Sequence, residues 1–103
     1  MGQIDYSIDL KDRINVINNL EHYIEKEHFL AAAELLRLYA EQNDLGEKEN
    51  ELAVKIANGL ITQNKEDGYD LAIGFLDCIG MPKIAINLRV IKDFKERKLE
   101  ERV

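Results

Sequence analysis

The sequence is poor in the residues on which several classes of protein depend. Its 103 residues include one cysteine, one proline and no tryptophan. A lone Cys78 excludes an intrachain disulfide and a four-cysteine metal site, and it fits a reducing compartment, where we expect it as a small buried hydrophobe. No apolar run reaches the roughly 18 residues that cross a bilayer, and no basic-then-apolar leader opens the chain. We therefore expect a cytoplasmic protein with no membrane contact.

Residues for catalysis are equally scarce. The chain has one serine, Ser7, and one threonine, Thr62, and its glycines form neither a nucleophile turn nor a phosphate-binding loop. His22, Glu25 and His28 are spaced three apart, as in Glu-x-x-His metal units, but di-iron bundles need a second such unit and further inward glutamates. We therefore interpret them as a solvated helix face. The sequence predicts no catalytic residue, no metal, no cofactor and no enzymatic activity.

The charge is unevenly distributed along this acidic protein, whose formal net charge is −6. Residues 1–81 hold seven Lys and Arg against sixteen Asp and Glu, whereas residues 82–103 hold seven against four. Two interpretations remain open for the basic C-terminal segment. It pairs with the acidic body or solvates itself, which contributes little to stability, or it contacts an acidic partner.

The hydrophobic pattern indicates one all-α domain over residues 1–103. The chain is 46% hydrophobic and 33% charged, which is typical of a folded globular domain. Apolar residues recur every three or four positions, which predicts helices at about 9–26, 29–43, 47–62, 68–80 and 82–101. A single long helix from 9 to 43 competes with a hairpin there. We expect Gly46 to end the second helix in a left-handed conformation. Residues 1–8 alternate polar and apolar, which suggests a short extended arm or a frayed terminus.

A faint repeat links the two halves of the chain. The motif Phe29-x-x-Ala32-x-x-x-Leu36 returns forty residues later as Tyr69-x-x-Ala72-x-x-x-Leu76, and Leu20 and Leu60 keep the same offset. Residues 16–40 and 56–79 thus resemble the helical hairpin of tetratricopeptide repeats, although Glu27 stands where that family has a glycine and its period is thirty-four. The resemblance implies a concave surface for peptides or partner helices, and no catalysis. The fold we predict is a four- to five-helix bundle or a short α-solenoid-like array.

Two glycines fall inside predicted helices. Gly59 and Gly74 each cost about 1 kcal/mol relative to alanine there, so a compensating reason is expected. A close helix crossing that leaves no room for a side chain is the favoured explanation. A pocket wall or a kink is the alternative.

The helices carry more apolar faces than five helices can readily bury. In the last helix, Ile84, Leu88 and Ile91 form one stripe, and Ile86, Val90 and Phe94 form another on a different side. The second and fourth helices also carry leucine or phenylalanine off their main stripes. A compact bundle with the last helix at its centre would hide them. The alternative, which we favour, is a second chain: another protein, or a copy of this one, most simply in a homodimer.

We therefore predict a small non-enzymatic protein–protein interaction module, acting as an adaptor, regulator, inhibitor or chaperone-like binder. The predicted interface comprises Leu35, Leu38, Phe75, Ile86, Val90 and Phe94. The predicted steering charges are Arg89, Lys92, Lys95 and Arg97. One alternative is a nucleic-acid-associated regulator that uses the basic last helix, although its carboxylates dilute the positive charge. Another is sequestration of a small anionic ligand between subunits, with Tyr23 or Tyr39 stacking on it.

Overall fold

The computed structural model describes residues 8–64 and 66–101, and the side chains of 8–64 and 66–96. These residues form five α-helices and no strand, as predicted. The helices are α1 (Arg13–Glu25), α2 (Phe29–Gln42), α3 (Glu47–Gln63), α4 (Gly68–Cys78) and α5 (Pro82–Glu101). Of the expected N-terminal arm, residues 1–7 lie outside the described residues, and Ile8 packs against the core.

The first helix begins one turn later than the pattern suggested. Asp12 is its N-cap, because its side chain accepts a hydrogen bond of 3.1 Å from the Asn15 N–H. Asp9 instead closes a preceding turn, in which its carboxylate accepts the Lys11 N–H at 2.9 Å. Both aspartates can cap a helix, and periodicity alone does not choose between them.

A hairpin, and not one long helix, joins α1 to α2. Glu27 adopts a left-handed conformation with φ of 60°. The His28 N–H reaches back to the Tyr23 carbonyl at 2.8 Å, and the Glu27 N–H reaches the Ile24 carbonyl at 3.0 Å. These two bonds form a Schellman motif, which satisfies the last carbonyls of α1 and turns the chain back.

The connection from α2 to α3 differs from its prediction. Gly46 is extended, with φ of −89° and ψ of −175°, and it precedes α3 as the N-cap. The end of α2 is Asn43, whose side-chain amide donates to the Tyr39 carbonyl and to the Leu10 carbonyl, each at 3.1 Å. A side chain thus provides the cap for which a left-handed glycine was expected.

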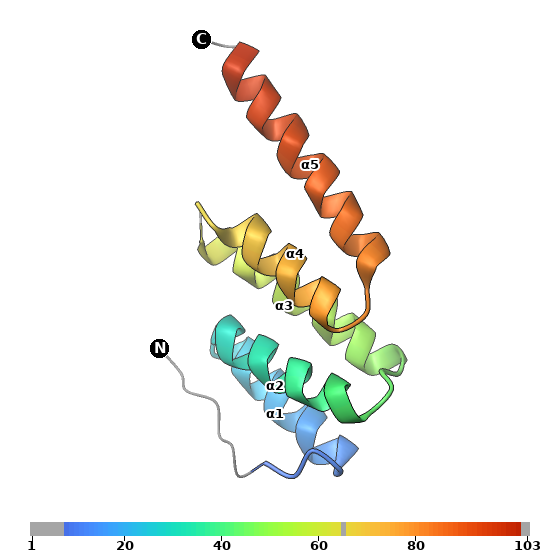
Figure 1. Ribbon diagram of the computed structural model, residues 1–103. Coiled ribbons are helices and arrows are strands. Elements are labelled where there is room, and N and C mark those ends of the chain that lie inside the picture. Colours follow the sequence, from blue (N-terminus) through green and yellow to red (C-terminus); the bar gives the residue numbers. More distant parts are fainter. Residues whose placement is uncertain (1–7, 65, 102–103) are drawn as a thin grey trace.

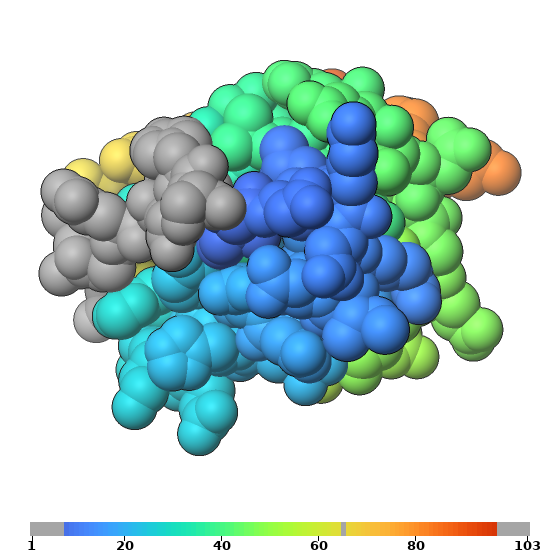
Figure 2. All heavy atoms as spheres, turned by 90° about the horizontal axis from the view of Figure 1, so that it is seen from below, coloured from blue at the N-terminus to red at the C-terminus, as the bar shows by residue number. Residues whose placement is uncertain are grey.

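An ion pair with a buried carboxylate and a half-exposed guanidinium joins the start of α1 to the start of α3. Arg13 donates to both carboxylate oxygens of Glu49, at 2.9 and 3.2 Å, and the Gly46 N–H donates to the same carboxylate at 3.2 Å. The carboxylate is only 1% exposed, whereas Arg13 is half exposed. Viewed from the α1 end (Figure 2), the first residues of α1 lie beside the segment that opens α3.

The helices pack in chain order around one hydrophobic core. α1 pairs with α2, α3 packs on both, α4 pairs with α3 and touches α2, and α5 packs on α4 (Figure 1). The repeated positions are equivalent in burial, because Ala32, Leu36, Ala72 and Leu76 are all fully buried. Two successive hairpins followed by a fifth helix therefore describe the architecture.

The position of α5 decides which faces stay exposed. Among the described residues, α5 contacts α4 and no other helix, and its C-terminal part points away from the body (Figure 1). The compact bundle with this helix at its centre is therefore not the structure. The molecule measures 51 × 27 × 17 Å, and α5 lies at the end of it remote from α1.

Candidate functional site

The candidate site is an apolar stripe along the side of α5 that faces away from α4. Ile86, Val90 and Phe94, hereafter the outer stripe, follow one another at intervals of four residues and are 55%, 62% and 60% exposed. The opposite side of α5 holds the fully buried Ala85 and the partly buried Ile84 and Leu88. Of the first stripe expected from the sequence, Ile84 and Leu88 are covered, but Ile91 is 44% exposed, so the expectation that it shares their burial is wrong. The second expected stripe is present and exposed.

Polar contacts with α4 accompany the apolar packing of Ile84, Ala85 and Leu88 that sets the rotation of α5. Arg89 pairs with Asp77 at 3.1 Å, and Lys92 pairs with Asp70 at 2.8 Å, which raises the pKa of Lys92. One turn further on, the Lys95 ammonium donates to the Tyr69 hydroxyl at 2.8 Å and lies 5.2 Å from the centre of its ring. These contacts turn the cations toward the body and leave the outer stripe facing solvent.

Three of the four predicted steering charges contact α4 within the chain. Arg89, Lys92 and Lys95 all bind α4, so the first interpretation of the basic segment, pairing with the acidic body, describes them. The side chain of Arg97 lies outside the described residues. A role in attracting a partner stays a prediction for these cations.

Two predicted interface residues belong to the core, which corrects the expectation for them. Leu35 is 1% exposed and Phe75 is 7% exposed, because α2 and α4 touch each other and turn these off-stripe side chains inward. Leu38 is half-buried. We retain Ile86, Val90 and Phe94 as the candidate interface and leave Leu35 and Phe75 out, while a role for Leu38 stays a prediction.

A shallow apolar groove of about 340 Å³ runs between α2 and α4, and sequence reasoning did not place it. Leu30 and Leu71 line the groove and are partly exposed, and Gly74 lines it without contributing a side chain. Leu30 and Leu71 are among the leucines that the sequence places off the main apolar stripes of the second and fourth helices, and this was the available signal for the groove. Cys78 also lines it and is exposed, so the expectation of a buried cysteine is wrong.

One rim of this groove carries a charged network on α2. Arg37 binds Glu34 through two nitrogens and binds Glu41 at 2.8 Å. The hydrogen bonds from Arg37 lower the pKa of the Glu34 carboxyl. The network lies within one helix face and stabilises it locally.

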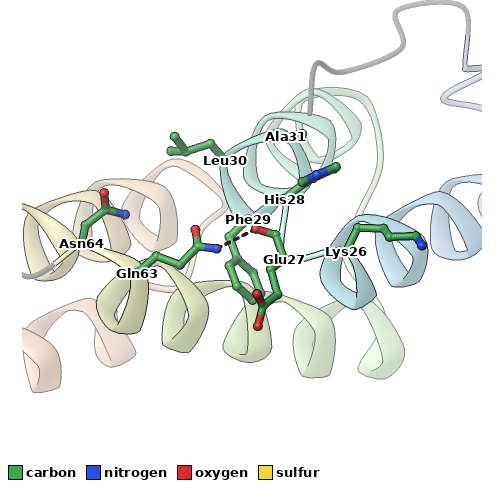
Figure 3. Close-up of a pocket in the computed structure, with 8 residues that line it drawn as sticks. All are labelled: Lys26, Glu27, His28, Phe29, Leu30, Ala31, Gln63 and Asn64. Carbon is green, nitrogen blue, oxygen red and sulfur yellow. Dashed lines mark hydrogen bonds between the residues drawn. The ribbon is translucent and has the colours of Figure 1, made fainter. Parts of the chain in front are cut away.

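A second hollow, of about 540 Å³, lies at the turn between α1 and α2 (Figure 3). Its rim is held by the Gln63 amide, which donates to the Glu27 carbonyl at 2.7 Å, so the end of α3 is tied to the turn. The Phe29 ring points from α2 toward α3, where it packs against Gly59. The lining of this hollow mixes lysine, glutamate, histidine and amide side chains with apolar groups, so it does not indicate one class of ligand.

The side chains that could bind a metal ion or take part in catalysis do not cluster in the described part of the chain. Within the part of the chain that the structure describes, no three His, Cys, Asp or Glu residues gather as metal ligands would. The Thr62 hydroxyl donates to the Asn58 carbonyl at 2.7 Å, as a helical threonine commonly does. Ser7 lies outside the described residues.

The two tyrosines suggested for ligand stacking are buried. Tyr23 and Tyr39 both belong to the core, and burial raises the pKa of the Tyr39 hydroxyl because the phenolate loses its hydration. Neither ring presents a face on which a ligand stacks, which corrects that expectation.

No family model matches the chain, and neither a curated protein nor a solved structure is significantly similar to it. Within residues 8–64 and 66–101, none of the helices combines the length and the apolar character that crossing a bilayer requires.

Proposed function

We propose that this chain is a small non-enzymatic protein–protein interaction module that binds its partner through the outer stripe of α5. The observation that carries the proposal is a second apolar side on this helix, which no other helix covers among the described residues. A helix on a protein surface ordinarily turns its apolar side inward and its charges to solvent. The inner side of α5 follows this rule, because Ala85 is fully buried, but Ile86 and Val90 on another side are more than half exposed.

The remaining architecture supports the same class of function. Three apolar side chains on one ridge form a contiguous docking strip, the arrangement by which helices bind partner helices. The hairpin repeat also supports an interaction role, because proteins that resemble tetratricopeptide repeats present helical surfaces to peptides or partner helices. An adaptor, regulator, inhibitor or chaperone-like binder fits these features.

The two alternative functions have less support. Nucleic-acid binding requires cations free to neutralise phosphates, and Arg89 and Lys92 already pair with carboxylates of α4. Ligand capture by Tyr23 or Tyr39 requires exposed rings, and these are buried.

Site-specific photo-crosslinking in the source cell tests the proposal. A photoreactive residue at Asn87, which is exposed next to the outer stripe, is expected to give discrete protein adducts, and the same residue at the exposed Asn58 on α3 is not. The double variant Val90→Ala, Phe94→Ala is expected to lose these adducts. Because both side chains are more than half exposed, its free energy of unfolding changes by less than about 1 kcal/mol.

Two results would contradict the proposal. Equal adduct patterns at Asn87 and Asn58 would show that the outer stripe has no binding preference. Loss of the helical circular dichroism signal in the double variant would show that Val90 and Phe94 belong to the core.

A further inference from the structure

Two charged residues beside the outer stripe take no part in the ion pairs that bind α5 to α4, although one of them, Asp93, also borders a hollow between the two helices next to Arg89 and Lys92. Lys83 and Asp93 are exposed, and among the described residues neither forms an ion pair. By contrast, Arg89 and Lys92 on the same helix pair with aspartates of α4. The charges left near the outer stripe thus have opposite signs, with Lys83 toward its start and Asp93 toward its end.

The positions of these residues are symmetric about one point of the helix. The midpoint of Lys83 and Asp93 is residue 88, and the midpoint of Ile86 and Val90 is also residue 88. An antiparallel pair of α5 helices with its twofold axis beside this residue therefore places Ile86 across from Val90 of the second copy. It also places Lys83 level with Asp93 of the second copy, and Phe94 level with the exposed Pro82.

We propose that the partner of the outer stripe is a second copy of this chain, bound through an antiparallel α5–α5 contact with Lys83 of each copy against Asp93 of the other. This inference rests on the proposed function, because it specifies which protein binds the outer stripe. A twofold contact is formed by the same patch on both copies, so opposite charges at symmetric positions are what it requires.

The charges whose side chains are described favour this register. The axis beside residue 88 sets Lys83 level with Asp93 of the second copy and also brings the apolar side chains together. Because the outer stripe follows a ridge of four-residue steps, interlocking ridges cross at about 50°.

The expected association is weak. One crossing pair of helices buries less than the roughly 1,600 Å² of a standard interface, and small interfaces of this kind belong to transient complexes. We expect an equilibrium between monomer and dimer with a dissociation constant in the micromolar range.

Sedimentation velocity of the full chain over a range of concentrations tests this contact. Lys83→Asp and Asp93→Lys, each alone, place like charges opposite each other and are expected to weaken self-association by more than about tenfold. An equimolar mixture of the two variants brings Asp and Lys together at both contacts. It is expected to form a dimer of the wild-type affinity, as is the double reversal within one chain.

The controls separate this effect from folding. Lys83 lies in the first turn of α5, where an aspartate favours the helix, so Lys83→Asp does not weaken association by unfolding α5. Lys55→Asp, the same change at an exposed position of α3, is expected to leave the affinity unchanged.

Three outcomes would overturn the inference: a wild-type chain that stays monomeric at all concentrations, single reversals that dimerise like wild type, or a mixture of the single reversals that stays monomeric. If the wild-type chain is monomeric while Asn87 crosslinks to another protein, the proposed function stands and this inference fails. If Asn87 gives adducts of two copies of this chain, both are supported.

Discussion

At the scale of single residues, Gly59 and Gly74 show two different reasons for a glycine inside a helix. A Cβ atom built at Gly59 would lie 2.3 Å from the ring of Phe29, so α2 and α3 meet there too closely for any side chain. This is the close helix crossing expected from the sequence. A Cβ atom at Gly74 would have no neighbour within 4 Å, because this glycine forms the wall of the α2–α4 groove.

Alanine substitution of these two glycines is expected to act in opposite directions. Gly59→Ala forces the Phe29 ring aside and lowers the free energy of unfolding by about 1–3 kcal/mol. Gly74→Ala adds a methyl group in open space on a helix and raises it by about 0.5–1 kcal/mol. Urea denaturation of both variants measures the difference, and equal effects would contradict this explanation.

Glu49 is the buried charge that sequence reasoning did not single out. Hydrogen bonds from Arg13, together with the Gly46 N–H, lower the pKa of its carboxyl despite the opposing effect of burial. The available signal was a glutamate three residues after an N-cap, a position at which it reaches back to the backbone N–H. Its partner Arg13 is 36 residues away, and local patterns do not reveal it.

The lowered pKa of Glu49 predicts an acid dependence of stability. As pH falls below the ordinary glutamate value of 4.5, the unfolded chain takes up this proton before the folded chain does. The contribution of Glu49 is therefore complete above that value and is lost as pH falls through the lowered pKa. Glu49→Gln is expected to lower stability at pH 7 by about 1.5–3 kcal/mol and to flatten this part of the profile.

Thermal denaturation between pH 7 and pH 3 measures both effects. Glu51→Gln, at an exposed position of the same helix, serves as the control, since that side chain does not contact Arg13. Parallel wild-type and Glu49→Gln profiles in the acid range would show that the ion pair does not carry the dependence.

At the scale of helices, α1 and α4 end in the same way with different residues. At the end of α4, the Met81 N–H binds the Leu76 carbonyl at 2.9 Å and Gly80 has φ of 82°, which repeats the Schellman motif found at Glu27. Glycine adopts this conformation without strain, whereas a residue with a side chain does so at a cost. The resemblance to tetratricopeptide repeats had identified Glu27 as the position where a glycine was missing.

Substituting the left-handed residue at each of these two helix ends gives a matched test. Glu27→Gly is expected to raise the free energy of unfolding by about 1 kcal/mol, because it relieves the left-handed backbone. Gly80→Ala is expected to lower it by about the same amount, since it introduces that strain. Urea denaturation compares them, and a destabilised Glu27→Gly variant would show that the Glu27 side chain contributes more than its backbone costs.

At the scale of the whole molecule, the helices differ in how much of the chain supports them. α3 packs against α1, α2 and α4, whereas α5 is supported by α4 alone among the described residues. The radius of gyration of 14.5 Å exceeds the roughly 13 Å of a compact chain of this length, in accord with a helix that points outward.

This asymmetry predicts a gradient of local stability. Amide hydrogen exchange is expected to be slow in α3 and faster in α5, because a helix with one packed side opens without unfolding the rest. If α5 pairs with a second copy, its protection is expected to rise with protein concentration while that of α3 stays constant. Equal protection of α3 and α5 in dilute solution would contradict this gradient.

The sequence by itself determined that the elements are helices and where most of them begin and end, because caps and apolar spacing act between residues close in the chain. It left open whether residues 9–43 form one helix or two, which the left-handed Glu27 decides. It also determined that α5 carries two apolar sides. Only the tertiary structure decided which apolar side chains are covered, because this depends on the direction from which a distant helix approaches. Leu35 and Phe75 are buried where α2 meets α4, whereas α5 packs on α4 through Ala85 and leaves Ile86 and Val90 facing solvent.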